Sequence, residues 1–233
     1  MNAMAKPVAQ AQKPTALGHL ALHYRPGEAQ LAARFFELIG ARVKTFGPFP
    51  NGDYFYLIAL NSAAPDEAED IVFLSAMTPQ QYELEQEMSA HLGLGTPHLH
   101  PKLQAFFAEK ARQPEFFLHF GVHFARLEDL EAAVQRLEAA MRSDPAFGAR
   151  FQGFQTLKAR AEANDADIPA RMAASPVFSK TEGYAFGRNI VQVHVRTDLF
   201  AAGLSFLGAV VELDYTFIGA KRERNPFNDL IMD

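Results

Sequence analysis

The amino-acid sequence predicts a mixed α+β protein made of two similar halves joined by a helical segment. Three observations lead to this prediction. Several short segments alternate apolar with polar residues or are continuously apolar, as strands are. Residues 28–39 and 127–141 place apolar side chains on one face of a helix. A pattern of two histidines followed by such a helix occurs twice, beginning at His19 and again at His119.

Length and composition set the class of protein. The chain has 233 residues, of which 48% are hydrophobic and 21% charged, as in ordinary globular proteins. Its net charge of -5 argues against nucleic-acid binding, which uses a basic face. The absence of cysteine excludes disulfides, thiolate metal ligands and cysteine nucleophiles. No uninterrupted apolar run of about 18 residues and no signal-peptide pattern is present, so we expect a cytoplasmic protein without a membrane span.

The first half, residues 17–77, is predicted to run strand, helix, strand, strand, strand. The helix at 28–39 has one apolar face and ends before Gly40, a common C-terminal stop. The segment 47–53 contains Gly, Pro, Asn and Asp, which favour a turn. The predicted strands are 17–25, 41–46, 54–60 and 71–77, with a polar loop at 61–70.

The rest of the chain is predicted to be a helical connector, a second half of the same order, and two tails. The connector covers 78–115 and is broken near 93–101, where Gly and Pro gather. A long insertion at 142–182 is expected to be irregular, with a short helix around 155–163. The second half, 116–217, has its helix at 127–141 and its predicted strands at 116–124, 190–197 and 207–217. Residues 1–16 are predicted to be a flexible tail and 218–233 a polar C-terminal tail.

The similarity between the halves extends to individual positions. Residues 18–36 and 118–136 both begin with a strand that contains two histidines four residues apart, and both continue into an amphipathic helix. The closing strands, 71–77 and 210–216, also align. The positions brought together by this alignment are His19 with His119, His23 with His123, and Phe73 with Glu212.

A duplicated βαβββ unit with a histidine in each opening strand resembles the vicinal oxygen chelate superfamily, which includes glyoxalase I, bleomycin-resistance proteins and extradiol dioxygenases. The resemblance is carried by GHLALHY at 18–24 and LGAVVELDY at 207–215, and it covers about residues 17–77 and 116–217. It implies two paired βαβββ modules that form a half-open barrel around one divalent metal ion.

The resemblance also implies a set of metal ligands. Its four ligand positions correspond to His19, Phe73, His119 and Glu212. Because phenylalanine cannot bind a metal, His19, His119 and Glu212 remain as the expected ligands. Two imidazoles and a carboxylate suit Fe, Mn, Ni or Zn and leave coordination positions for a substrate. Such an ion polarises a carbonyl or enolate oxygen.

Three further histidines are candidate catalytic residues. On a strand, residues separated by an even number share a face, so His23 and His123 are expected on the same face as the proposed ligands. His194, in the strand 190–197, is a candidate general acid or base. The alternative for all three is a structural histidine with a local hydrogen-bond partner. Because an unpaired carboxylate is costly in an apolar strand, Glu212 is expected to have a cation or strong hydrogen-bond donors as partners.

The sequence therefore supports two hypotheses of different classes. The first is a metal-dependent enzyme that acts on a small oxygenated organic molecule, with dioxygenase, lyase, isomerase and thiol-transferase chemistry left open. Residues 198–212 lack the Tyr and the Pro-Gly turn of extradiol dioxygenases, which weighs against ring cleavage. The second is a non-catalytic protein that sequesters a small molecule, as bleomycin-resistance proteins do. The expected partners are a small molecule and a second copy of the chain, with no nucleic acid and no membrane; a monomer in light scattering would contradict the homodimer.

Overall fold

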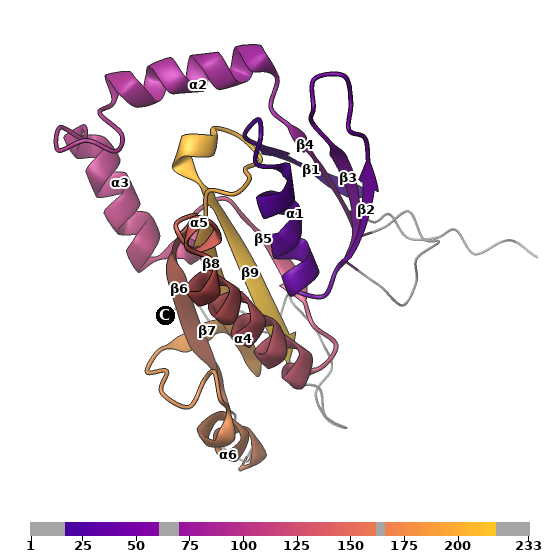
Figure 1. Ribbon diagram of the computed structural model, residues 1–233. Helices are drawn as coiled ribbons and strands as arrows, with labels where there is room; N and C mark the ends of the chain where they lie inside the picture. The colour runs from indigo at the N-terminus through magenta and orange to yellow at the C-terminus, as the bar shows by residue number, and fades with distance from the viewer. Residues whose placement is uncertain (1–16, 61–69, 162–165, 218–233) are drawn as a thin grey trace, which may run out of the picture.

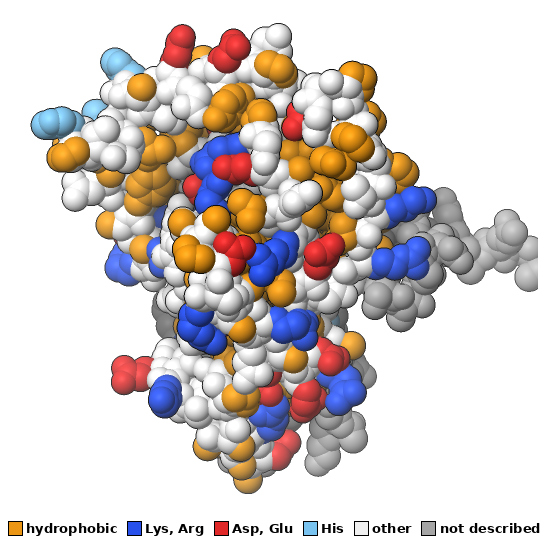
Figure 2. Space-filling view, in the orientation of Figure 1, with side chains coloured by type: hydrophobic (Ala, Val, Ile, Leu, Met, Phe, Trp, Pro, Cys, Tyr) orange, Lys and Arg blue, Asp and Glu red, His pale blue; other side chains and the backbone are white. Residues whose placement is uncertain are grey.

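The computed structural model describes residues 17–60, 70–161 and 166–217 (Figure 1). The predicted tails, 1–16 and 218–233, lie outside these residues. The described chain is a mixed α+β structure with two sheets. None of its helices is long and apolar enough to cross a membrane. On the face shown in Figure 2, side chains of both charge signs are interspersed with hydrophobic ones.

The first sheet has four strands in the order β1-β4-β3-β2. The edge strand β1 pairs in parallel with β4, whereas β4 with β3 and β3 with β2 are antiparallel. One face of the sheet is buried in the core that includes α1, because Leu22, Tyr24, Ile58 and Leu74 are buried on that side and alternate with less buried residues on the other. The elements of this half are β1 (His19–Tyr24), α1 (Ala29–Leu38), β2 (Arg42–Phe46), β3 (Phe55–Ala59) and β4 (Ile71–Ala76).

Two helices, α2 and α3, connect the sheets and form an arm in which α2 runs across the top of the molecule and α3 descends at the left in Figure 1. The helices α2 (Pro79–His91) and α3 (Pro101–Arg112) are separated by Gly93 and Gly95, whose positive φ angles end the first helix. Buried Glu85 attaches the arm to the second half, since its carboxylate accepts hydrogen bonds from the backbone N and the hydroxyl of Ser205. A 3₁₀ turn, η1 (Pro114–Phe116), leads into the second sheet.

The second sheet has five strands in the order β5-β9-β8-β6-β7 and curls into a half-barrel. Its β5 and β9 are parallel, and β9, β8 and β6 are successively antiparallel. In both sheets the first strand thus pairs in parallel with the last. The elements of this half are β5 (His119–His123), α4 (Leu127–Ser143), α5 (Pro145–Gly148), β6 (Phe151–Arg160), α6 (Asp167–Ala174), β7 (Tyr184–Arg188), β8 (Ile190–Thr197), η2 (Ser205–Leu207) and β9 (Ala209–Thr216).

The prediction of a short helix around 155–163 is wrong, because β6 occupies most of that segment. A register shift between Phe151 and Gly153 interrupts the two-residue alternation that marks a strand, so the sequence pattern does not reveal it. Pairing with β8 along most of its length then stabilises β6 as a strand. Tertiary pairing therefore outweighs local preference in this segment.

One hydrophobic core joins the two halves. The helices α1 and α4 both contribute to it, and Phe200 lies at the junction. The centroid of its ring lies 5.2 Å from the ring centroid of Phe35, 5.1 Å from that of Phe36 and 6.3 Å from that of Phe120. Aromatic pairs at these separations are favourable beyond the area that they bury. The sheets are therefore held in a fixed relation through side chains of both halves.

The insertion that contains α6 is anchored by a buried carboxylate, and this gives a stability prediction. Glu131 of α4 accepts hydrogen bonds from Arg171 at 3.0 and 2.6 Å and from the Ser175 hydroxyl at 2.5 Å. The change Arg171→Met would leave the Glu131 charge with only the hydroxyl. We expect it to lower the free energy of unfolding by about 2 kcal/mol, below the range for fully buried pairs because Arg171 is partly exposed. Chemical denaturation measures the loss, and Arg112→Met, at an exposed ion pair, should cost almost nothing.

Candidate metal centre

One face of the second sheet carries the candidate site. The other face bears valines and Leu213 and is buried in the core. On the polar face, strand register aligns side chains across neighbouring strands. One row across β5, β9, β8 and β6 contains Gly121, Glu212, His194 and Gln155, and the next contains His123, Asp214, Gln192 and Leu157.

Within the described residues, Glu115, His194 and Glu212 form a group that could hold a metal ion. One potential ligand atom from each lies within 4.8 Å of the others. The Nε2 atom of His194 is 2.7 Å from Oε2 of Glu115 and 3.8 Å from Oε2 of Glu212. His194 is fully buried and Glu212 is 7% exposed, while Glu115 is partly buried. The group therefore combines one imidazole and two carboxylates away from bulk water.

These separations fit a small divalent ion. Ligand atoms at about 2.0–2.2 Å from a metal lie at most roughly 4.4 Å from each other. Both distances measured from Nε2 of His194 are below that limit. Two buried atoms beside the group, Nδ1 of His194 and Oε1 of Gln192, have no hydrogen-bond partner among the described residues. The donor set and its geometry thus fit a metal, and the unsatisfied atoms mark a polar environment that is incomplete without a ligand or water.

His119 adds a second imidazole to the group. Its Nδ1 donates a hydrogen bond to the Phe117 carbonyl at 2.8 Å, which directs Nε2 towards Glu212 at 3.3 Å. The hydrogen bond with Glu212 raises the pKa of His119 to about 9, against an opposing effect of burial. Burial raises the pKa of Glu212, but hydrogen bonds from His119 and Gln192 and the nearby imidazoles outweigh it, and the net pKa is lowered. Glu212 is therefore a carboxylate at neutral pH.

Two hydrogen-bonded residues further along the face form a histidine–aspartate pair. Nδ1 of His123 donates to Oδ1 of Asp214, so the carboxylate orients the imidazole. Because Asp214 follows Glu212 by two residues on β9, their backbone positions lie about 7 Å apart along the strand and their side chains share a face of the sheet. An imidazole held in this way can accept or donate a proton to a molecule bound between the two positions.

The structure brings together some of the sequence-predicted residues and separates others. His119, His194 and Glu212 meet on the second sheet. His19 lies on the first sheet, is exposed, and packs against Phe73 with ring centroids 4.6 Å apart. His23, on the same face, shares a 3.1 Å hydrogen bond with the Ser75 hydroxyl. His19 is therefore outside the metal-capable group, and His194, predicted as an acid or base, belongs to it.

Sequence reasoning missed Glu115, which completes the group. It lies in η1, just before β5, in a segment assigned to the end of the helical connector. A single acidic residue in the apolar stretch Pro-Glu-Phe-Phe was an available signal, but a 3₁₀ turn has no periodicity that predicts where the side chain is directed. Its proximity to His194 depends on the return of β8, 79 residues later.

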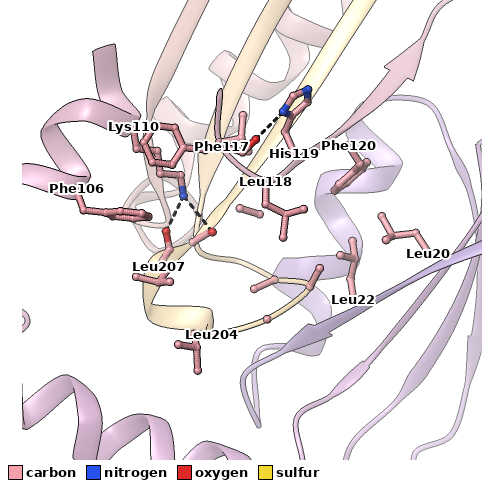
Figure 3. Close-up of a pocket in the computed structure, with 16 residues that line it drawn as sticks. Leu20, Leu22, Phe106, Lys110, Phe117, Leu118, His119, Phe120, Leu204 and Leu207 are labelled. Carbon is pink, nitrogen blue, oxygen red and sulfur yellow. Dashed lines mark hydrogen bonds between the residues drawn. The ribbon is translucent and has the colours of Figure 1, made fainter. Parts of the chain in front are cut away.

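An apolar cavity of about 140 Å³ adjoins the group and shares His119 with it (Figure 3). The cavity is lined by leucine and phenylalanine side chains of β1, α3 and β5 and by the loop that precedes β9. A comparison of the chain with protein-family models, curated proteins and solved structures found no match.

Proposed function

We propose that this protein is a metal-dependent enzyme that acts on a small oxygenated organic molecule. The observation that carries the proposal is the group Glu115, His194 and Glu212, with His119 beside it, on a polar sheet face. Glu115 and Glu212 bring carboxylate oxygens within 4.8 Å of each other, and two like charges this close are unfavourable unless a cation or a proton compensates them. A divalent cation would compensate both carboxylates of the group at once.

The strand topology supports the finer proposal of two paired βαβββ modules in a half-open barrel. The first sheet has the order β1-β4-β3-β2. In the second sheet the neighbours β5-β9-β8-β6 occupy the corresponding places, so that β5 matches β1, β9 matches β4, β8 matches β3 and β6 matches β2. Register adds a residue-level equivalence, because Phe73 lies across from Ala21 and Glu212 lies across from Gly121. This is the arrangement expected from a resemblance to the vicinal oxygen chelate superfamily, and it supports assignment of the chain to that class.

The ligand chemistry favours Mn, Fe, Ni or Zn. Imidazole suits Zn, Fe and Ni, carboxylates suit Mn as well, and the chain offers no thiolate. When bound, such an ion acts as a Lewis acid towards a carbonyl, enolate or hydroxyl oxygen of the substrate. Glu115, His194 and Glu212 would hold it, while His119 forms a hydrogen bond with Glu212. Gln192 donates a 2.7 Å hydrogen bond to Oε1 of Glu212 and so fixes the orientation of that carboxylate.

Residues beside the proposed metal ligands would transfer protons, orient His119 and exclude water. Asp214 orients the ring of His123. Nε2 of His123 would then donate a proton to the substrate or accept one from it. The backbone carbonyl of Phe117 accepts a hydrogen bond from Nδ1 of His119 and so fixes the orientation of the ring. Leucine and phenylalanine side chains at the neighbouring cavity exclude water from one side of the site. Dioxygenase, lyase, isomerase and transferase reactions all use these elements.

A non-catalytic small-molecule binding protein is the second candidate. The observation in its favour is the apolar cavity beside His119, which can retain a hydrophobic ligand without a metal. The two functions differ in their requirement for an ion.

Metal analysis distinguishes the two candidates. Protein purified without chelators, or reconstituted with Mn, Fe, Ni or Zn and then desalted, should retain about one ion per chain by mass spectrometric elemental analysis. The variant Glu109→Gln changes an exposed carboxylate and should retain the same amount. Retention near zero for all four metals would contradict the enzyme proposal and favour the binding protein.

A further inference from the structure

The lining of the apolar cavity includes one cationic side chain, Lys110, that has no role in the proposed metal chemistry. Its walls include Leu20, Leu22, Phe106, Phe117 and Phe120. The ionisable side chains in its lining are His119 and Lys110. His119 is paired with Glu212, so its charge is compensated. Lys110 has no ion pair with any acidic side chain among the described residues.

Lys110 is held in place but is not neutralised. It is 3% exposed, and its Nζ donates to the backbone carbonyls of Leu207 at 2.6 Å and Gly208 at 3.1 Å. Figure 3 shows these two bonds and the nitrogen at the cavity wall. An ammonium group has three N–H donors, so one remains for a ligand. The two carbonyls position the ammonium group and leave its full charge in an apolar environment.

A second positive charge makes this environment less favourable for the ammonium group. Burial and then the positive charge of Arg196 lower the pKa of Lys110 to about 8. Arg196 also has a buried Nε without a hydrogen-bond partner among the described residues. Two cations therefore lie near each other, and neither has a carboxylate partner in the described part of the chain. A buried charge is stabilised by a counter-ion, so the cavity is electrostatically suited to an anion.

We propose that this cavity binds a small amphipathic carboxylate, with the carboxylate on Lys110 and a ring or short hydrocarbon chain against the leucine and phenylalanine walls. The volume of about 140 Å³ is similar to that of apolar cavities that bind benzene. A single remaining N–H matches one carboxylate oxygen, whereas the leucine and phenylalanine side chains of the walls have no polar groups to solvate a phosphate dianion. The inference goes beyond the metal centre, since Lys110 is not part of that group.

A fluorescent reporter can test the cavity directly. The chain contains no tryptophan, so Phe106→Trp places a single indole on the cavity wall with an aromatic replacement. Benzoate and hexanoate should change its emission saturably near pH 7, where most of Lys110 is protonated. Benzyl alcohol and 1-hexanol, which match them in size without the charge, should bind at least tenfold more weakly. Equal affinity for acids and alcohols would overturn the role of Lys110, and no saturable change with any of the four would overturn the site.

Variants separate the two sites. In the reporter protein, Lys110→Met should abolish the preference for acids over alcohols, and Lys110→Arg, which keeps the charge, should retain at least part of it. If Lys110→Met does not fold, the comparison of acids with alcohols in the reporter protein still decides. Glu115→Gln, at a proposed metal ligand that is not in the cavity lining, should leave the acid affinity within about twofold while it impairs metal binding, so failure of one proposal is distinguishable from failure of the other. A loss of acid binding in Glu115→Gln would contradict an independent site on Lys110.

Discussion

Glu212→Gln is expected to abolish metal retention while leaving the fold intact. The substitution keeps the size of the side chain but removes its charge, and it removes one of the two carboxylates that face His194. Loss of a single supporting residue around a bound metal commonly costs 10–100-fold in affinity, and loss of a charged ligand should exceed that, so we expect a decrease of at least about 100-fold. Calorimetric titration with Zn or Mn measures the change in Kd.

The control for this variant is a second glutamate of similar burial. Glu131 is 6% exposed, like Glu212, but binds Arg171 and Ser175 on the opposite side of the sheet from the site. Glu131→Gln should weaken the fold and keep the metal affinity. Unchanged metal affinity in Glu212→Gln, or equal losses in both variants, would contradict the proposed ligand set.

Arg150→Met is expected to cause the largest loss of stability among single charge changes. Arg150 is 13% exposed and contacts Glu28 from the first half and Asp198 from the second. It also donates a 3.0 Å hydrogen bond to the Asp198 carbonyl. Removing one partner of a buried ion pair leaves an uncompensated charge, which costs about 3–5 kcal/mol. For a chain of this length, that corresponds to a decrease in Tm of roughly 6–20 °C.

A matched substitution tests whether burial causes the effect. Arg142 forms an i,i+4 ion pair with Glu138 on α4, and both side chains are well exposed. Arg142→Met should change Tm by less than about 2 °C, because exposed pairs contribute little. A decrease of the same size in both variants would show that the Arg150 contacts are not the cause. A small effect for Arg150→Met would show that the hydrophobic contacts around Phe200 are sufficient to hold the halves together.

Elements with a strong local pattern could be predicted from the sequence. The alternation in β1 and the apolar faces of α1 and α4 each identify their element, because each buries one side against a neighbour. The strand β6 could not be predicted in this way. Its register shift near Gly153 breaks the alternation, and its stability comes from pairing with β8, which lies distant in the sequence.

The candidate site was predictable only in part for a similar reason. Glu212 stood out as a carboxylate in an apolar strand, and His119 stood out through the repeat. His194 and Glu115, rather than His19, lie beside Glu212 because of how the second sheet curls and how η1 is oriented. Neither the curl nor the orientation follows from strand periodicity. His19 shares the repeat pattern of His119, yet it lies against Phe73, where the equivalent position in the second sheet holds Glu212.

Anomalous diffraction from crystals of the metal-loaded protein tests the metal centre most directly. Data collected on either side of the absorption edge of Mn, Fe, Ni or Zn locate the ion without assumptions about its ligands. We predict one peak about 2.0–2.2 Å from oxygens of Glu115 and Glu212 and from Nε2 of His194, with His119 adjacent. A peak bound by His19, or no peak between Glu115, His194 and Glu212 in crystals that contain stoichiometric metal, would contradict this assignment.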